Sequence, residues 1–387
     1  MKKKIAILGA TGSIGRTTLK IINENKKKLS VELLTTNRNY KKLLVDAKKF
    51  KVRNVIIYDQ KVLIKKISLF KKFKINVFNN LNEFKIRNKI KFDYAISAIP
   101  GISGLVPTLD LISLTKKIAI ANKESIICGW NLIEKKLKTY NTKFIPVDSE
   151  HFSIWSLIRN YKNNQISKIY LTASGGPFLN WPKNKISKAS AKMAIKHPNW
   201  SMGKKISIDS ATLMNKIFEV IEAQRIFKLP KSKLDILIHQ KSYVHALVEF
   251  KNGIKTILAH DTDMIVPISN SIFDKEKFNI KKTNINLNLM NNLNFTKIDK
   301  KKFPVISLLK LIPEKISLFE TVLTSSNDEL VDLYIKNKIK FTDIFKNLSK
   351  VLNSSEFKEY KSKTPKNAGE INALNDYVRL KTRKLCI

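Results

Sequence analysis

The sequence has few glycines and almost no cysteine. Its 387 residues include 11 glycines and 2 cysteines, whereas average proteins contain about 7% glycine. Cys128 and Cys386 stand far apart and form neither a disulfide framework nor a zinc-binding pattern. Such cysteine usage is typical of a reducing compartment, and we therefore expect a cytoplasmic protein.

Long apolar runs are also missing. No stretch approaches the length of a membrane span, so we expect no membrane partner. A glycine-rich turn begins close to Met1, and we therefore expect no signal or transit peptide before it. A chain of this length can bury large cores and is expected to hold two or three domains, which is enough for an enzyme.

Negative charge is scarce. Lys and Arg total 73 against 31 Asp and Glu, which gives a formal net charge of +42. A nucleic-acid-binding protein is one explanation, and it would bind DNA or RNA with a steep dependence on salt. The lysines, however, are spread along the whole chain without interleaved aromatic residues or one basic tail. We therefore interpret most of the charge as solvated surface and expect no nucleic-acid partner.

The glycines that are present gather in ILGATGSIGRTT at residues 7–18. An apolar strand-like run precedes this stretch, and a run with helical spacing follows it. Gly9 can make the tight exit from the strand, Gly12 lets the backbone approach a pyrophosphate, and Gly15 allows close helix–sheet packing. The amides of the new helix then face the phosphates. The stretch predicts a dinucleotide or nucleotide site, with a purely structural turn as the alternative.

The next strand-like run, VELLTTNRN, indicates which dinucleotide binds. NAD-binding folds usually present an acidic residue at its end, where this sequence has Asn37, Arg38 and Asn39. A guanidinium group suits a 2′-phosphate. NADP(H) is therefore favoured over NAD(H), unless Arg38 is one more solvated arginine.

Strand-like and helix-like segments alternate over residues 1–147, which predicts an α/β fold with a Rossmann-like doubly wound sheet that binds NADPH. SAIPGISG follows another of these strands and is expected to border the same crevice. We expect 148–273 to form an α+β catalytic domain, 274–299 a polar linker and 300–387 a small all-α domain.

Three acidic residues indicate a metal. Asp148 and Glu150 in PVDSEHF are two apart, so in an extended chain their carboxylates project to one side. Glu219 shares a helical face with Asn215 and Lys216, off the apolar stripe of the same segment. Oxygen ligands alone suit Mg²⁺ or Mn²⁺. A surface ion pair between Lys216 and Glu219 is the alternative.

Three further stretches carry polar or large side chains near strand ends or in loops. TASGGPF places Ser174 beside two glycines, which predicts a phosphate or hydroxyl site or only a tight bend. IANKES places Lys123 just after a strand, within reach of a substrate or of the nicotinamide. HPNWSMG holds Trp200 and Met202 in a loop that suggests a lid, or a loop anchored in a core by its tryptophan.

These motifs occur together in one enzyme family. GATGSIG, ANKES, PVDSEH, SGGPF and HPNWSMGKKISIDSATLMNK stand in the order and at the separations found in 1-deoxy-D-xylulose 5-phosphate reductoisomerases, and the sequence resembles that family from residue 1 to about 270. The resemblance implies an NADP-dependent oxidoreductase that converts 1-deoxy-D-xylulose 5-phosphate to 2-C-methyl-D-erythritol 4-phosphate for isoprenoid precursor synthesis. It also implies bound NADPH, a Mg²⁺ or Mn²⁺ ion and a homodimer.

The same resemblance assigns residues to roles. It implies that the metal is ligated by Asp148, Glu150 and Glu219, which with Lys123 would be the catalytic residues. It implies that the phosphorylated substrate is held by Lys123, Ser149, Glu150, Ser174, His197, Ser210, Asn215, Lys216 and Glu219. It implies that NADPH is bound by Thr11, Gly12, Ser13, Ile14, Asn37, Arg38, Asn39, Asn122, Glu124 and Gly203.

The sequence also departs from the family pattern. Members usually have glycine where Asn37 stands, a glycine near His260 and a Trp-Pro pair shortly after it, and the C-terminal helices match only weakly. We therefore expect an altered turn on the adenine side. A semialdehyde dehydrogenase, which also opens with GATG, is the rival enzyme, but it needs a nucleophilic cysteine. Cys128, inside a helix-like segment, is a poor candidate.

Overall fold

The computed structural model describes residues 1–274, 276, 278, 280 and 284–386. The described chain divides into two compact units, each assembled from separate stretches of sequence. The first unit comprises Met1–Ser125, Asn131–Asp148 and Met264–Ile280, and the second comprises Ile126–Trp130, Ser149–Asp263 and Lys281–Ile387.

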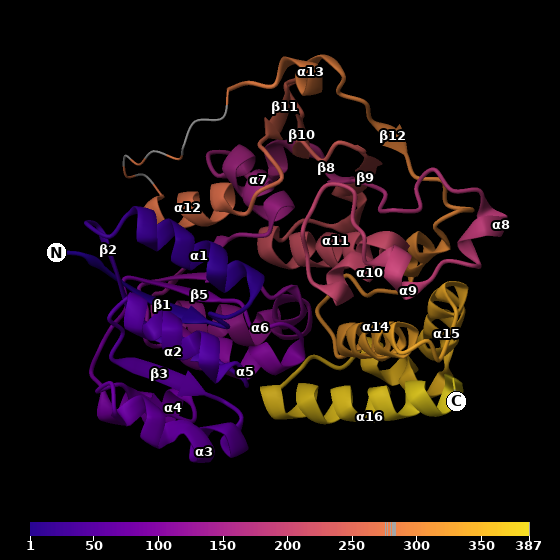
Figure 1. Ribbon diagram of the computed structural model, residues 1–387. Helices are drawn as coiled ribbons and strands as arrows, with labels where there is room; N and C mark the ends of the chain where they lie inside the picture. Colours follow the sequence, from indigo (N-terminus) through magenta and orange to yellow (C-terminus); the bar gives the residue numbers. More distant parts are fainter. Residues whose placement is uncertain (275, 277, 279, 281–283, 387) are drawn as a thin grey trace. The chain divides into compact units, whose positions relative to one another are not determined.

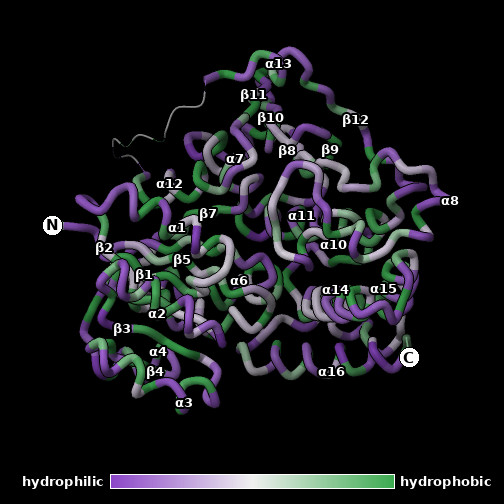
Figure 2. The backbone as a smooth tube through the Cα atoms, viewed as in Figure 1, coloured by the Kyte–Doolittle hydropathy of each residue, from purple (hydrophilic) through white to green (hydrophobic). Residues whose placement is uncertain are grey.

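The first unit is built on a seven-stranded parallel sheet with the order β4-β3-β2-β1-β5-β6-β7. Its strands are β1 (Lys3–Leu8), β2 (Leu29–Thr36), β3 (Asn54–Ile57), β4 (Asn76–Phe78), β5 (Tyr94–Ser97), β6 (Lys117–Ile120) and β7 (Lys143–Pro146). These strands are mostly apolar (Figure 2), as expected for a parallel sheet covered on both faces. The strand order reverses between β1 and β5, and ligands of such sheets bind at that crevice. The predicted doubly wound sheet is confirmed.

Helices connect these strands. They are α1 (Ser13–Glu24), α2 (Tyr40–Lys49), α3 (Gln60–Lys71), α4 (Leu81–Arg87), α5 (Leu105–Ile112) and α6 (Lys123–Thr139). A further helix, α12 (Ile265–Phe273), joins this unit from much later in the sequence and lies beside α1 (Figure 1). Its Ile268, Ile272 and Phe273 are buried in the core of the unit, and its Ser271 hydroxyl lies 2.6 Å from the hydroxyl of Tyr94.

The glycine turn between β1 and α1 is required by close packing. Gly9 has φ +74°, and a Cβ there would lie 2.5 Å from the carbonyl oxygen of Ala98. A Cβ on Gly15 would lie 2.5 Å from the carbonyl oxygen of Gly9. Neither position accepts a side chain, so α1 starts tight against the end of β1.

The second unit contains a mixed five-stranded sheet with the order β11-β10-β8-β9-β12. Its strands are β8 (Ile166–Ala173), β9 (Leu234–Ile238), β10 (Val244–Phe250), β11 (Lys255–Ala259) and β12 (Thr296–Lys297). Only the β8–β9 pair is parallel. The helix α7 (Ser149–Ile158) precedes these strands. The helices of this unit that lie between them in the sequence are α8 (Lys183–Ile186), α9 (Ala191–Ala194), α10 (Lys204–Thr212), α11 (Met214–Phe227) and α13 (Leu287–Asn291). The helices α7 and α11 contact the sheet.

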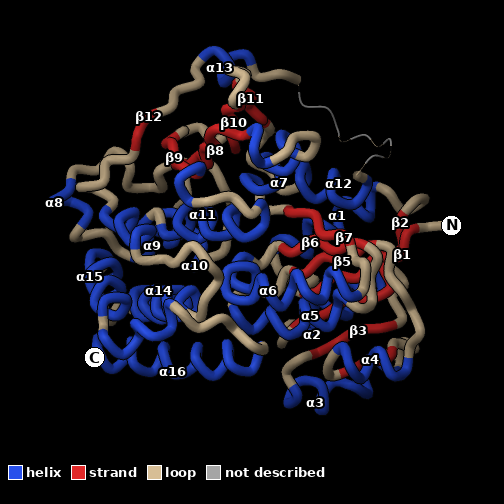
Figure 3. Tube along the Cα trace, turned by 180° about the vertical axis from the view of Figure 1, so that it is seen from behind, coloured by secondary structure: helices blue, strands red, loops and turns tan. Residues whose placement is uncertain are grey.

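After β12 the described residues form helices and turns only (Figure 3). The long helices are α14 (Phe319–Ile335), α15 (Phe341–Asn353) and α16 (Ala368–Cys386). Buried α14 is held by ion pairs. The Nη2 atom of Arg379 lies 3.0 Å from Oε2 of Glu329, and Nε of Arg383 donates to Oε1 of the same carboxylate at 2.7 Å. No helix of the described chain is long and apolar enough to cross a membrane.

Candidate active site

A cavity of about 480 Å³ lies in the first unit, where the glycine turn, the end of β2 and the loop after β5 meet. It is lined by five of the residues expected to bind the cofactor: Thr11, Gly12, Asn37, Arg38 and Asn39. The SAIPGISG loop contributes Ala98, Ile99, Pro100 and Ser103. The sequence analysis did not single out Thr35, Thr36 and Tyr58, which also line the cavity. Their position at or just after the ends of β2 and β3 could have indicated them.

The N-terminus of α1 opens beside this cavity. Gly12 is the N-cap residue, and no side chain caps the helix. The amides of Ser13 and Ile14 therefore belong to a first turn that can bind an anion, with the helix dipole adding attraction. The hydroxyl of Thr11 lies 2.9 Å from the hydroxyl of Thr36, and this hydrogen bond orients the Thr11 side chain.

Arg38 is held at one edge of the cavity. Its Nε donates to Oδ2 of Asp59 at 2.6 Å, while 77% of its side chain stays exposed. Asp59 also accepts from the amide of Val62, and this bond together with Arg38 lowers the pKa of the Asp59 carboxyl. Asn37 does not have a positive φ, so the departure from the family's glycine is accommodated in ordinary backbone geometry.

The start of α6 gathers further predicted residues. Asn122 caps the helix by accepting from the amide of Ser125 at 2.9 Å, and its Nδ2 donates to the carbonyls of Ile99 and Gly101. Lys123 is buried, and its Nζ lies 3.1 Å from Oδ2 of Asp148. Glu124 is buried in the same turn. Lys123 is thus paired with a predicted metal ligand.

Lys216 on α11 is the centre of a buried charge cluster in the second unit. Its Nζ donates to Oε1 of Glu150 on α7 at 2.8 Å, to the carbonyl oxygen of Thr172 and to Oε2 of Glu219. Lys216 is 4% exposed and Glu219 only 1%, so their pairing is not the surface ion pair that the sequence left open. Burial lowers the pKa of Lys216, but the two carboxylates outweigh it and raise the pKa above its ordinary value.

Neighbouring groups orient both carboxylates. Ser149 donates to Oε2 of Glu150 at 2.6 Å, and Asn215 donates to Oε1 of Glu219. His151 on α7, which sequence reasoning did not single out, has Nε2 2.9 Å from the carbonyl oxygen of Glu219. It joins the helix that carries Glu150 to the helix that carries Glu219. Asp148 ends the first unit, two residues before Glu150 in the sequence.

Ser174 and His197 form a second polar pair, next to the end of β8. The Nδ1 atom of His197 accepts from the amides of Asn199 and Trp200 at 3.1 and 3.0 Å. The ring proton therefore resides on Nε2, which lies 3.0 Å from the Ser174 hydroxyl. Burial and the nearby Lys216 lower the pKa of His197 to about 4. The imidazole is neutral near pH 7 and donates a hydrogen bond.

The HPNWSMG loop leads from His197 to α10. Trp200 is half-buried, and the centroid of its ring lies 6.0 Å from that of His245 at an interplanar angle of 68°. Met202 is also half-buried, and Gly203, the remaining predicted cofactor residue, is the N-cap of α10 in the second unit. Ser210 lies near the end of α10. Leu213, with φ 63°, separates that helix from α11.

Comparison with known proteins identifies the family of this chain. Three family models match the chain: 1-deoxy-D-xylulose 5-phosphate reductoisomerase over residues 5–129, the C-terminal domain of that enzyme over 144–227, and the DXP reductoisomerase C-terminal domain over 260–381. Similar proteins named 1-deoxy-D-xylulose 5-phosphate reductoisomerase include one from Pelagibacter ubique, 54% identical with 100% of both chains covered. One from Persephonella marina is 39% identical with 92% of both chains covered.

Solved structures give the same result. The enzyme from Zymomonas mobilis in complex with NADPH superposes with a TM-score of 0.88 at 29% identity, over 100% of this chain and 99% of that one. A DOX-P reductoisomerase in complex with NADPH, fosmidomycin and magnesium has a TM-score of 0.89 at 30% identity, over 99% of this chain and 97% of that one. The chain belongs to the 1-deoxy-D-xylulose 5-phosphate reductoisomerase family.

Proposed function

We propose that Asp148, Glu150 and Glu219 hold the divalent metal with which this enzyme works. The enzyme isomerises and reduces 1-deoxy-D-xylulose 5-phosphate to 2-C-methyl-D-erythritol 4-phosphate, with NADPH and a divalent metal as cofactors. The observation that carries the assignment is the convergence of Glu150 and Glu219 on one buried ammonium. One ammonium compensates only one of the two negative charges, and the remaining charge and the carboxylate oxygens suit Mg²⁺ or Mn²⁺.

The metal, when bound, supplies Lewis acidity and a template for the ketone and hydroxyl oxygens of the sugar. The chain itself supplies the geometry. Ser149, Asn215 and His151 hold the carboxylates and their helices in place, and Lys216 donates to both carboxylates. Lys123, paired with Asp148, presents a buried ammonium that can donate a proton or a hydrogen bond to a substrate oxygen.

The phosphate of the substrate is assigned to groups near the end of β8 and on α10 and α11. Neutral His197 can donate from Nε2, and the Ser174 hydroxyl accepts from that nitrogen and from the amide of Gly176. Ser210, Asn215 and Lys216 add further donors, so the set suits a phosphorylated sugar rather than an apolar substrate. Trp200 belongs to a loop that we assign as a flap closing over the bound substrate.

NADPH is assigned to the cavity of the first unit. The amides of Ser13 and Ile14 at the start of α1 would face the pyrophosphate, and Arg38 would bind the 2′-phosphate. Thr11, Gly12, Asn37 and Asn39 line the same cavity. Asn122 fixes the loop after β5 beside it, while Glu124 and Gly203 complete the set carried over from the family. NADPH supplies the hydride for the reduction.

We assign the NADPH-binding role to 1–147, the catalytic role to 148–273, a linker to 274–299 and a helical domain to 300–387. We further propose a homodimer in the cytoplasm. The family resemblance supports the dimer, and the two free cysteines, Cys128 and Cys386, fit a reducing compartment.

The direct test is an NADPH-oxidation assay with 1-deoxy-D-xylulose 5-phosphate, run with Mg²⁺, with Mn²⁺ and after chelation by EDTA. We expect absorbance of NADPH to fall only when substrate and metal are both present, and sedimentation to give a dimer. Full activity in EDTA would refute the assignment of the carboxylates. A chain that oxidises NADPH without substrate would point to a different reaction.

A further inference from the structure

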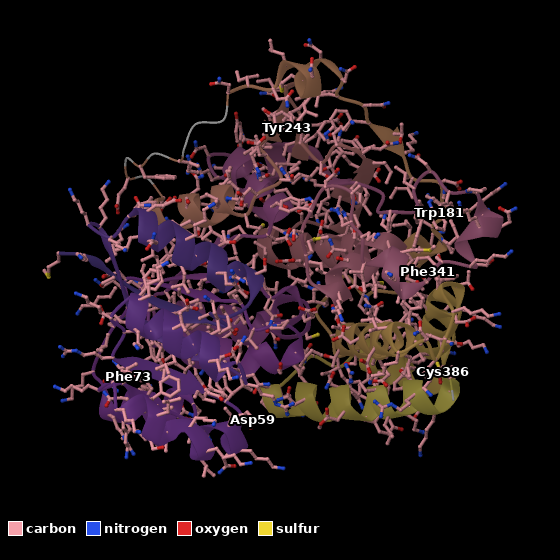
Figure 4. The ribbon with its side chains drawn as sticks, viewed as in Figure 1. Asp59, Phe73, Trp181, Tyr243, Phe341 and Cys386 are labelled. Carbon is pink, nitrogen blue, oxygen red and sulfur yellow. The ribbon has the colours of Figure 1, made fainter. Side chains whose placement is uncertain are left out.

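An apolar cavity in the second unit lies apart from the groups assigned above to catalysis. Its volume is about 320 Å³, at the lower end of the roughly 300–1,000 Å³ typical of small-molecule sites. Its apolar walls include Phe178, Met214, Phe303, Phe341, Ile344 and Leu348. The rings of Phe178 and Phe341 meet edge to face with centroids 5.1 Å apart, and Trp181 packs on the same Phe178 (Figure 4 labels Phe341 and Trp181).

The charged side chains of the lining are all lysines. They are Lys183, Lys301 and Lys302, and no acidic residue lines the cavity. Lys302 donates to the backbone carbonyls of Leu179 and Trp181. Lys183 and Lys301 are exposed, and neither forms an ion pair with any other residue that the structure describes. The mouth of the cavity is therefore cationic, whereas its walls are apolar.

One polar residue of the lining is deeply buried. Asn327 on α14 has no exposed surface, and its Nδ2 donates to Oδ1 of Asp209 at 2.8 Å. Its Oδ1 accepts from no group within the described part of the chain. Buried acceptors are nearly always paired, because an unpaired one loses its bonds to water without replacement. The unpaired oxygen can accept from a ligand that brings a donor.

We propose that this cavity binds a small amphipathic anion that carries a hydroxyl group. The apolar body of the ligand lies between Phe178 and Phe341, its anionic group pairs with Lys183 and Lys301, and its hydroxyl donates to Oδ1 of Asn327. The lining also includes Ala211, Thr212 and Met214, which connect Ser210 to Asn215. A ligand there contacts the segment between two residues assigned to the substrate site.

The test measures binding to the full-length protein in EDTA by titration calorimetry, with 10-hydroxydecanoate as the probe. We expect saturable binding of one molecule per chain, and about fourfold weaker binding for each methylene removed from the probe. Replacing the carboxylate by a second hydroxyl, in 1,10-decanediol, should weaken binding about tenfold or more. Decanoate should bind no more tightly than the hydroxy acid. Tighter binding of decanoate than of the hydroxy acid would show that the hydroxyl finds no acceptor and would overturn the proposal.

Variants locate the site. Thr342→Trp, at an exposed position of the lining, should block the mouth and abolish binding, and Lys183→Glu with Lys301→Glu should weaken it about tenfold or more. Lys300→Glu, which changes the neighbouring lysine outside the lining, is the matched control and should bind like the parent. NADPH oxidation at parental rates shows that each variant is folded. Unchanged affinity in Thr342→Trp, or no saturable binding by the parent, refutes the proposal without affecting the assigned catalytic function.

Discussion

The ammonium of Lys216 lies 2.8 Å from Oε1 of Glu150, and this contact joins α11 to α7 inside the second unit. Glu219 binds the same ammonium from three residues along α11. One buried cation therefore holds two buried or half-buried carboxylates, and the cluster keeps an excess of negative charge. We expect a divalent metal to compensate that charge and therefore expect stability and metal binding to be coupled.

Glu219→Gln should abolish most activity. The substitution keeps the size of the side chain and removes its charge, and we expect kcat/KM to fall by about 100-fold or more because the metal contributes several kcal/mol to catalysis. The melting temperature should change little. Glu249→Gln, on β10 and outside the cluster, is the control. Near-normal turnover of Glu219→Gln at limiting Mg²⁺ would contradict the assignment.

Lys216→Met should destabilise the protein and make its stability depend on metal. Removing the ammonium leaves two carboxylates uncompensated, which costs about 3–5 kcal/mol in comparable buried pairs. Mg²⁺ should then raise the melting temperature of the variant more than that of the parent. Lys255→Met, which breaks the surface pair with Glu249 at 3.6 Å, should cost about 1 kcal/mol or less. If Mg²⁺ raises the melting temperatures of Lys216→Met and of the parent equally, Lys216 is not part of the metal site.

Arg38→Ala should weaken NADPH binding and spare NADH. A hydrogen bond to a charged group contributes about 1.5–3 kcal/mol, and the exposed pair with Asp59 contributes little to stability. Dissociation constants for both cofactors, measured by fluorescence titration, provide the comparison. Arg53→Ala, just before the start of β3, is the matched control. Equal losses for NADPH and NADH would indicate a structural role for Arg38.

His197 should make stability depend on pH in the acidic range. The folded state holds its pKa at about 4 against an ordinary value of 6.5, so between these values the unfolded chain binds more protons. The contribution of neutral His197 to the free energy of unfolding is complete above pH 6.5 and is lost as the pH falls toward 4. His197→Gln should therefore lose less melting temperature than the parent between pH 7 and pH 5, by roughly 1–3 °C after allowance for partial exposure. If the variant and the parent lose the same melting temperature between pH 7 and pH 5, His197 does not have the lowered pKa described above.

Trp200→Ala should reduce activity markedly with little change in melting temperature. The half-buried ring contacts His245 by its edge, and a mobile loop adds little to global stability. Misplacing a reacting group by about 1 Å can cost ~10²-fold in rate. Substrate or a phosphonate analogue with Mg²⁺ should slow proteolysis between Lys196 and Lys205. Trp181→Ala, another half-buried tryptophan of this unit, should change stability more than activity. The reverse pattern would make Trp200 a core anchor.

The sequence predicted the parts of the fold that depend on neighbouring residues. Alternating strand and helix patterns predicted the parallel sheet, and the scarce glycines marked its ligand end, where Gly9 and Gly15 have no room for a side chain. Contacts between residues far apart in the sequence could not be predicted in this way. The Lys216–Glu219 pair looked like a surface pair because the burial of Lys216 depends on Glu150, 66 residues away. The left-handed backbone of Leu213 could not be predicted either, because leucine rarely adopts a positive φ.

The return of α12 to the first unit affects how the chain can be made. The seven strands of that unit are complete at Pro146, but the helix that covers part of its core begins only at Ile265. During synthesis the ribosome therefore produces all the proposed catalytic side chains before the hydroxyl of Tyr94 meets Ser271. Until then, the first unit of the nascent chain exposes apolar surface to chaperones and proteases. A fragment that stops at Asp148 keeps the whole first sheet but lacks the helix that seals it.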